Sequence, residues 1–172
     1  MNSVSILFIL FLGCTCFGQI VEIPDPRYKA FLVRNYDMND DGEISEAEAE
    51  AVTGLMFCES SGITDLTGIA AFINLEELVC DINQLTSLPD LSTITNLVLL
   101  SCNTNQLTSL PDLSALTKLE FLACGGNQLT SLPDLSAFTS LYRLSCDGNQ
   151  LTSLPDLSAL TNLTLLTCQG NQ

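Results

Sequence analysis

One short segment of this 172-residue chain carries oxygen-bearing side chains at close and regular spacing. These side chains belong to Asp37, Asn39, Asp41, Glu43, Ser45 and Glu48, and they surround the single glycine of the segment, Gly42. The chain contains no histidine, so the commonest general base and the commonest nitrogen ligand for metals are missing. Oxygen donors suit a hard cation such as calcium, which takes six to eight oxygen ligands. Residues 37–48 are therefore a candidate calcium site.

Residues 37–48 match the EF-hand calcium loop, which has ligands at positions 1, 3, 5, 7, 9 and 12 and glycine at position 6. The ligands that the resemblance implies are the side chains of Asp37, Asn39 and Asp41, the backbone carbonyl of Glu43, Ser45 directly or through water, and both oxygens of Glu48. EF-hands normally pair, and only one such loop is visible here. A cap that keeps the EF-hand shape without useful affinity therefore stays open as an alternative.

The residues on both sides of this loop predict helices. Asp25 followed by Pro26 is typical of a helix N-cap and the first helical position, and residues 46–52 can form a short exiting helix. We expect residues 19–52 to form a small helical cap that calcium stiffens. The cap would cover the apolar end of whatever follows, around Met56 and Ile63.

The chain after the loop repeats itself every 22 residues. The segment Asn-Gln-Leu-Thr-Ser-Leu-Pro-Asp-Leu-Ser begins at Asn83, Asn105, Asn127 and Asn149, and a fifth Asn-Gln begins at Asn171. Each is preceded by Leu-x-x-Leu-x-Cys, and a less regular copy occupies residues 53–74. A single unit of this size cannot bury its own apolar face, so stacked units must share one core.

The repeat resembles the leucine-rich-repeat family, with cysteine in place of the third leucine of the signature. Its 22-residue length and its Leu-x-x-Leu-Pro-x-Leu return are similar to the internalin-type branch of bacterial surface proteins. The resemblance implies a solenoid of six coils over residues 53–172, the last one truncated, behind a helical N-terminal cap. Short parallel strands would line the concave face, and irregular or 3₁₀ turns the convex face. Because the sequence stops before the return of the sixth coil, we expect a fragment or a missing C-terminal part.

Three repeat positions carry polar or sulfur groups whose places can be predicted. The asparagine that ends each strand is expected to bond backbone groups of its own coil and the next one. The aspartates on the convex side, Asp90, Asp112, Asp134 and Asp156, are expected to cap turns, with a second cation site as an alternative. Six cysteines, Cys58, Cys80, Cys102, Cys124, Cys146 and Cys168, take an inward position in the repeat. We expect buried free thiols, while some bridging or a stacked metal site stays open.

The first 18 residues carry no charged side chain and include an unbroken apolar run, which is typical of a secretory signal cleaved after Gly18. An alternative is a lipoprotein signal with acylation at Cys14. No later segment predicts a membrane span. The protein is therefore expected to be secreted or held at the extracellular surface.

The net charge of −15 disfavours binding to nucleic acid and to anionic lipid, and favours a cation or a basic partner. Outward positions on the predicted strands vary most between repeats, so they are the candidate partner-binding residues. The set is Glu77, Val79, Leu99, Phe121, Tyr142, Arg143 and Leu165. Aromatic residues and arginine are the types enriched in interface hot spots.

These features predict an exported, monomeric protein-binding or surface-recognition module with calcium in its cap. The sequence shows no histidine, no nucleophile elbow and no phosphate loop, so we do not expect an enzyme. Two alternatives stay open: a targeting or spacer domain of a longer secreted enzyme, and a structural surface protein.

Overall fold

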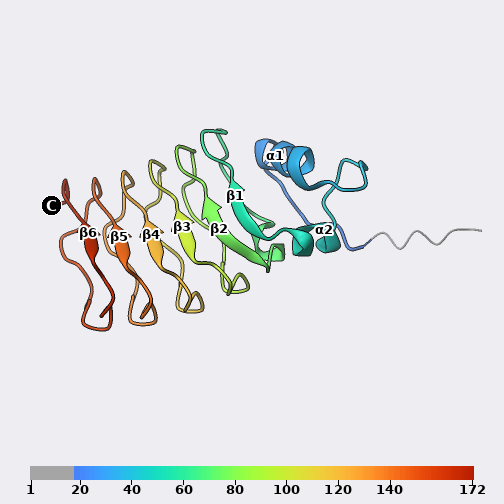
Figure 1. Cartoon of the computed structure of the whole chain (residues 1–172). Coiled ribbons are helices and arrows are strands. Elements are labelled where there is room, and N and C mark those ends of the chain that lie inside the picture. Colours follow the sequence, from blue (N-terminus) through green and yellow to red (C-terminus); the bar gives the residue numbers. More distant parts are fainter. Residues whose placement is uncertain (1–17) are drawn as a thin grey trace, which may run out of the picture.

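The computed structural model describes residues 18–172, so the expected signal segment, apart from Gly18, and the alternative acylation site at Cys14 lie outside it. The elements, in chain order, are α1 (Pro26–Tyr36), α2 (Glu46–Ala51), β1 (Gly54–Phe57), the 3₁₀ helix η1 (Ile69–Ala71), β2 (Leu75–Val79), β3 (Leu99–Ser101), β4 (Phe121–Ala123), β5 (Arg143–Ser145) and β6 (Leu165–Thr167). Figure 1 shows the strands stacked in sequence order, with α1 and α2 at the β1 end. Neither α-helix in the described residues is long and apolar enough to cross a bilayer.

The six strands form one parallel sheet in the order β1 to β6. From β2 onward each residue pairs with the residue 22 positions later, as in the series Glu77, Leu99, Phe121, Arg143 and Leu165. The register shifts between Gly54 and Leu55, in the coil whose sequence is least regular. The predicted solenoid with its helical cap is therefore confirmed.

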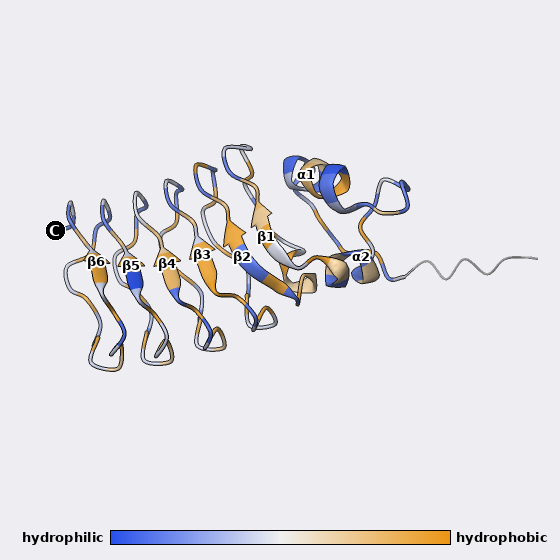
Figure 2. Cartoon of the chain, viewed as in Figure 1, coloured by the Kyte–Doolittle hydropathy of each residue, from blue (hydrophilic) through white to orange (hydrophobic). Residues whose placement is uncertain are grey.

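The core is a continuous column of leucines, which come from the strands and from the return segments that lead from each strand to the next. Leu100 on β3 and Leu107 and Leu113 on its return are fully buried, and the same positions repeat in the neighbouring coils. Burying one leucine side chain contributes about 1.5–3 kcal/mol, so each added coil stabilises the stack. The returns are turns with i to i+3 bonds, such as Ile94 N to Leu91 O at 3.0 Å, as expected. Figure 2 shows hydrophilic segments on β2 and β5, where Glu77 and Arg143 lie.

The buried asparagines bond as expected to their own coil, but the second coil that they reach is the preceding one and not the next. Asn105 Nδ2 donates to Cys80 O at 3.0 Å and to Cys102 O at 3.2 Å, and its Oδ1 accepts from Leu85 N at 3.0 Å. The strand-end N–H groups already point forward, as in Cys80 N to Ser101 O at 2.8 Å. The backbone groups left for the asparagine therefore lie behind it.

The six described cysteines are free, as expected, and five of them are buried. Cys80 donates both its N–H and its S–H to the carbonyl of Ser101, with Sγ to O at 3.3 Å. Burial raises the pKa of the Cys58 thiol to about 12 and that of Cys146 to about 11, so these thiols stay protonated at neutral pH. Cys168 differs from the expectation because it is exposed, on the last coil of the sheet.

Candidate functional site

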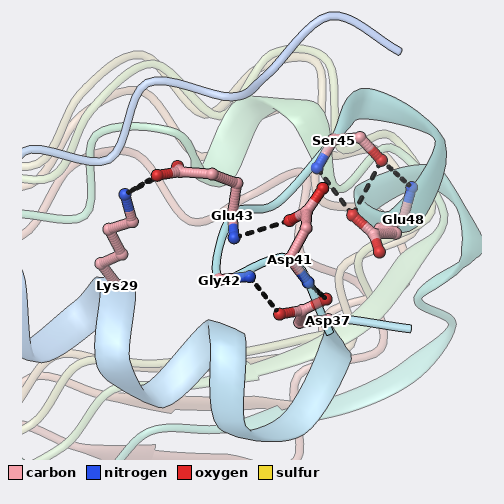
Figure 3. Close-up of polar contacts among 7 residues, drawn as sticks. All are labelled: Lys29, Asp37, Asp41, Gly42, Glu43, Ser45 and Glu48. Atoms are coloured by element: carbon pink, nitrogen blue, oxygen red, sulfur yellow. Dashed lines mark hydrogen bonds and ion pairs between the residues drawn. The ribbon is translucent and has the colours of Figure 1, made fainter. Parts of the chain in front are cut away.

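Residues 37–48 are called the candidate cation loop, and its first half is folded around its own aspartates (Figure 3). Asp37 Oδ2 accepts from Gly42 N at 2.8 Å, and Asp41 Oδ1 accepts from Glu43 N at 2.9 Å. Asn39 Oδ1 accepts from Asp41 N at 2.9 Å. The φ of Gly42 is 81°, in the left-handed region that glycine adopts without strain, so the predicted sharp turn lies where the sequence placed it.

Glu43 turns its side chain away from the other acidic groups of the loop. Both of its carboxylate oxygens lie 2.7 Å from Lys29 Nζ on α1 (Figure 3). The pair is partly exposed, and such pairs contribute at most about 1 kcal/mol. The Glu43 side chain is thus held by Lys29 in this conformation, and the role of its backbone carbonyl as a ligand stays a prediction.

Glu48 ties the end of the loop to its beginning. Its Oε2 accepts from Ser45 N and from Ser45 Oγ, both at 2.8 Å, and its Oε1 accepts from Met38 N at 2.9 Å. Ser45 and Glu48 together form the capping box of α2. Burial raises the pKa of Glu48, but the bonds from Ser45 and Met38 outweigh it and the pKa is lowered overall. The Glu48 carboxylate is therefore charged at neutral pH.

The donor chemistry of this loop fits a hard cation, since it consists of carboxylate, amide, hydroxyl and carbonyl oxygens. In residues 18–172 no group of three or more Asp, Glu or Cys side chains is gathered closely enough to hold a metal ion. The carboxylates of Asp37, Asp41 and Glu48 accept from backbone N–H groups in this conformation. Each carboxylate oxygen has further lone pairs, so a bonded carboxylate can still bind a cation after a small reorientation.

The loop pairs with the N-terminal segment of the same chain. Ile20 and Ser45 form an antiparallel bridge, Val21 N donates to Ile44 O at 2.8 Å, and Glu46 N donates to Gln19 O at 2.8 Å. The fully buried Ile44 is thereby fixed against residues 19–21. The sequence prediction missed this pairing, which holds the loop against residues 19–21.

Asp25 joins the cap to the first coil, a role that the sequence prediction also missed. Its Oδ1 caps α1 by accepting from Arg27 N at 2.8 Å and Tyr28 N at 2.9 Å, as expected. Its Oδ2 accepts from Thr64 N and Thr64 Oγ1, both at 2.7 Å, and from Asp65 N at 3.2 Å. Burial raises the pKa of Asp25, but these hydrogen bonds outweigh it and lower the pKa from 3.8 to about 2.

Further contacts press the cap onto the solenoid. The buried Tyr28 hydroxyl lies 3.7 Å from Met56 Sδ, and Arg27 Nη1 donates to Gly62 O at 2.7 Å. Met56 and Ile63 are fully buried. The cap therefore covers the apolar end of the solenoid, as the sequence predicted.

Six of the seven candidate partner-binding residues lie on strands, where the register places them in columns along the sheet. The first outward column is Leu55, Glu77, Leu99, Phe121, Arg143 and Leu165, and the second begins with Phe57 and Val79. Leu55 and Leu165 are 48% and 43% exposed. Tyr142, which immediately precedes β5, is 46% exposed. The Arg143 guanidinium lies 4.8 Å from the centre of the Phe121 ring, a cation–π geometry.

A polar network continues the concave face beyond the strand ends. Asp81 accepts from Ser101 Oγ at 2.8 Å and from Asn103 N at 2.7 Å. Asn103 Oδ1 accepts in turn from Gly125 N at 2.7 Å. These bonds link three successive coils, so this column stabilises the stack as well as lining the surface.

The convex aspartates cap turns, as the sequence predicted. Asp90 Oδ1 accepts from Ser92 N at 2.8 Å, and Asp112, Asp134 and Asp156 make the equivalent bond. The bonds from Ser92 lower the pKa of Asp90.

Comparisons with known proteins agree with the repeat pattern. A family model described as Leucine Rich repeats (2 copies) matches residues 95–137 and 117–159. The chain is similar to the functional domain of InlJ from Listeria monocytogenes, which includes a cysteine ladder, with 32% identity and a TM-score of 0.70 over 90% of this chain and 39% of that one. A search of curated proteins finds no match.

Two further solved structures extend this likeness. The internalin inlF from Listeria monocytogenes str. 4b F2365 is 26% identical, with a TM-score of 0.69 over 87% of this chain and 44% of that one. The leucine-rich effector YopM from Yersinia pestis is 33% identical, with a TM-score of 0.55 over 59% of this chain and 28% of that one. The chain thus spans less than half the length of each of these proteins. The 22-residue repeats, the parallel solenoid and these likenesses identify the chain as a leucine-rich-repeat protein similar to the bacterial internalins.

Proposed function

We propose that this chain is an exported recognition module that binds a protein partner on its concave face. The observation that carries the proposal is the outward strand column, in which large side chains of different types stand in register. Leu55, Phe57 and Leu165 remain 43–54% exposed on the strands, whereas the inward leucines of the inner coils, such as Leu78, Leu100 and Leu122, are fully buried. Exposed apolar residues gathered on one face are typical of contact surfaces.

The variation between repeats supports this assignment. The inward strand positions hold leucine or cysteine in every regular coil, while the outward column changes from Glu77 to Leu99, Phe121 and Arg143. A solenoid needs only the inward positions for its core, so the outward ones are available for specificity. Phe121 and Arg143 also contact each other, which orders both side chains before a partner arrives.

The second part of the proposal is calcium binding by residues 37–48. The ligand set of the EF-hand resemblance would hold the ion, and the ion would supply positive charge to a loop of six carboxylates. The chain's own residues support such a role, because Glu48 already joins the end of the loop to Met38 at its beginning. A site with an affinity of about 10⁻⁴ to 10⁻³ M, as in extracellular modules, would suffice outside cells.

A peptide-display selection against residues 19–172 tests partner recognition. Enriched clones are then measured against Val79→Arg, which places a bulky charge on the concave face, and against Thr86→Arg, a control on an exposed return residue. We expect clones to lose binding to the first variant and keep binding to the second. Clones that bind both variants equally would show that the concave face is not the recognition surface.

Calorimetric titration of calcium tests the cap. Glu48→Gln removes one carboxylate of the predicted ligand set, and Glu46→Gln removes the same charge from an exposed position of the same helix. We expect saturable binding and a raised melting temperature that Glu48→Gln abolishes and Glu46→Gln preserves. The site would be refuted if calcium produced no heat of binding and no change in the melting temperature.

The proposal of export rests on the uncharged residues 1–18. Measuring the mass of the secreted protein tests it, because cleavage after Gly18 would leave Gln19 as the first residue.

A further inference from the structure

The largest exposed apolar side chains of the concave face cluster at the cap end of the sheet. Leu55 and Phe57 on β1 are 48% and 54% exposed, and Met56 between them is fully buried, so both point outward. Leu55 aligns with Glu77 and then Leu99, and Phe57 aligns with Val79. The four apolar residues of these aligned positions, Leu55, Phe57, Val79 and Leu99, are called the β1–β3 patch.

The β1–β3 patch lies in a part of the chain without positive charge. Residues 35–117 contain 14 of the 20 acidic residues and none of the five lysines and arginines. Glu77 stands inside the patch, between Leu55 and Leu99. Glu59 and Asp81 lie two residues after the ends of β1 and β2. Arg27 of α1 reaches the first coil at Gly62 O, but the acidic excess of residues 35–117 still attracts partners of the opposite sign that also carry apolar groups.

We propose that the β1–β3 patch binds a partner-protein segment in which lysine or arginine alternates with large apolar side chains. This inference rests on the proposed function and names the chemistry of the partner. The apolar side chains cover Leu55 and Phe57, and the cationic groups lie against Glu77 and the strand-end carboxylates. A second copy of this chain would bring two charges of −15 together, and nucleic acid or an anionic membrane would be repelled for the same reason.

Three fluorescent twelve-residue peptides test the proposal by anisotropy. They share leucine and phenylalanine at alternate positions and carry lysine, serine or glutamate at the others. We expect the lysine peptide to bind about tenfold or more tightly than the serine peptide, and the glutamate peptide not to bind. The affinity of the lysine peptide should fall as the salt concentration rises, because salt screens partly exposed charges.

Matched variants separate the patch from general attraction to an acidic protein. Glu77→Gln and Phe57→Ser are each expected to weaken the lysine peptide about fivefold or more, and neither side chain is buried enough to unfold the protein. The controls are Asp134→Asn, which removes the same charge from a convex turn, and Ile73→Ser, which removes an apolar residue that is 38% exposed outside the strands. Unchanged thermal melting verifies the fold of all four.

Equal affinity for the lysine and serine peptides, or equal weakening by patch and control variants, would overturn the inference. Concentration-dependent light scattering that Phe57→Ser abolishes would do the same, because it would assign the patch to a second copy. The display experiment distinguishes failure of this inference from failure of the proposed function. If the display clones depend on Val79 but carry neutral or acidic sequences, the concave face recognises proteins and only the basic chemistry is wrong.

Discussion

Replacing Asp25 by asparagine should weaken the junction between the cap and the first coil in a pH-dependent way. Asparagine keeps one acceptor oxygen for the α1 cap but presents an NH₂ group in place of the second. In the native protein the Oδ2 oxygen accepts from Thr64 N, Thr64 Oγ1 and Asp65 N. In the variant the NH₂ group would face these three donors, at a side chain that is only 5% exposed. Buried polar groups left without partners destabilise the folded state.

The size of the effect follows from the pKa of Asp25. A fall from 3.8 to about 2 corresponds to about 2.4 kcal/mol of stability contributed by the charged form. Because the folded-state pKa is the lower one, this contribution is present above pH 4 and disappears as the pH falls toward 2. About half of it remains at pH 3. At neutral pH we expect the melting temperature of Asp25→Asn to be about 5–10 °C lower than that of the native protein.

Urea unfolding of residues 19–172 between pH 2.5 and 7 measures this difference. Glu22→Gln, an exposed residue of the same segment, is the matched control for loss of one negative charge and should stay within about 0.5 kcal/mol of the native protein. The native protein and Asp25→Asn should converge as the pH falls from 4 toward 2.5. A constant gap across this range would falsify the argument, because the charged form of Asp25 would then contribute nothing.

Three further predictions concern the repeat stack and its junction with the cap. Asn105→Ala leaves buried groups, including Leu85 N, without partners, so chemical denaturation should show a loss of about 3 kcal/mol or more. Iodoacetamide at pH 8 should modify only Cys168 in native residues 19–172, because burial raises the pKa of the other five thiols, and mass spectrometry counts the labels. Gly68→Ala should lower stability by about 2 kcal/mol or more in thermal melts, because φ is 101° and an added Cβ would lie 2.8 Å from Glu22 O.

The solenoid could be predicted because every repeat has apolar residues at the same positions, so the same core requirement is seen several times. One coil shows leucine at Leu97, Leu100 and Leu107, and the neighbouring coils show apolar residues at the same offsets. Side chains alternate across a strand, so the inward and outward columns followed from the register alone. Outward positions such as Leu99 and Phe121 were therefore assigned correctly to one face.

The junction between cap and solenoid could not be predicted, because it is made once and has no period. The bonds from Thr64 to Asp25 join residues 39 positions apart, and nothing in the local sequence of either signals the other. The pairing of Val21 with Ile44 is similar, since an isolated bridge has too little pattern to detect. The prediction that each asparagine bonds to the next coil, and not to the preceding one, was wrong for a different reason. The repeat shows which residue is buried, and only the geometry of the strand-end carbonyls shows which coil it reaches.

The position of the cap connects the two proposed sites of this molecule. The candidate cation loop is held to residues 19–21 and to α2, and α1 is held to the first coil by Asp25. β1, which carries Leu55 and Phe57, begins three residues after α2 ends at Ala51. In a solenoid each coil is stabilised mainly by its neighbours, so β1 depends on β2 on one side and on the cap on the other. Any change that loosens the cap should therefore disturb the β1–β3 patch before it reaches Phe121 and Arg143.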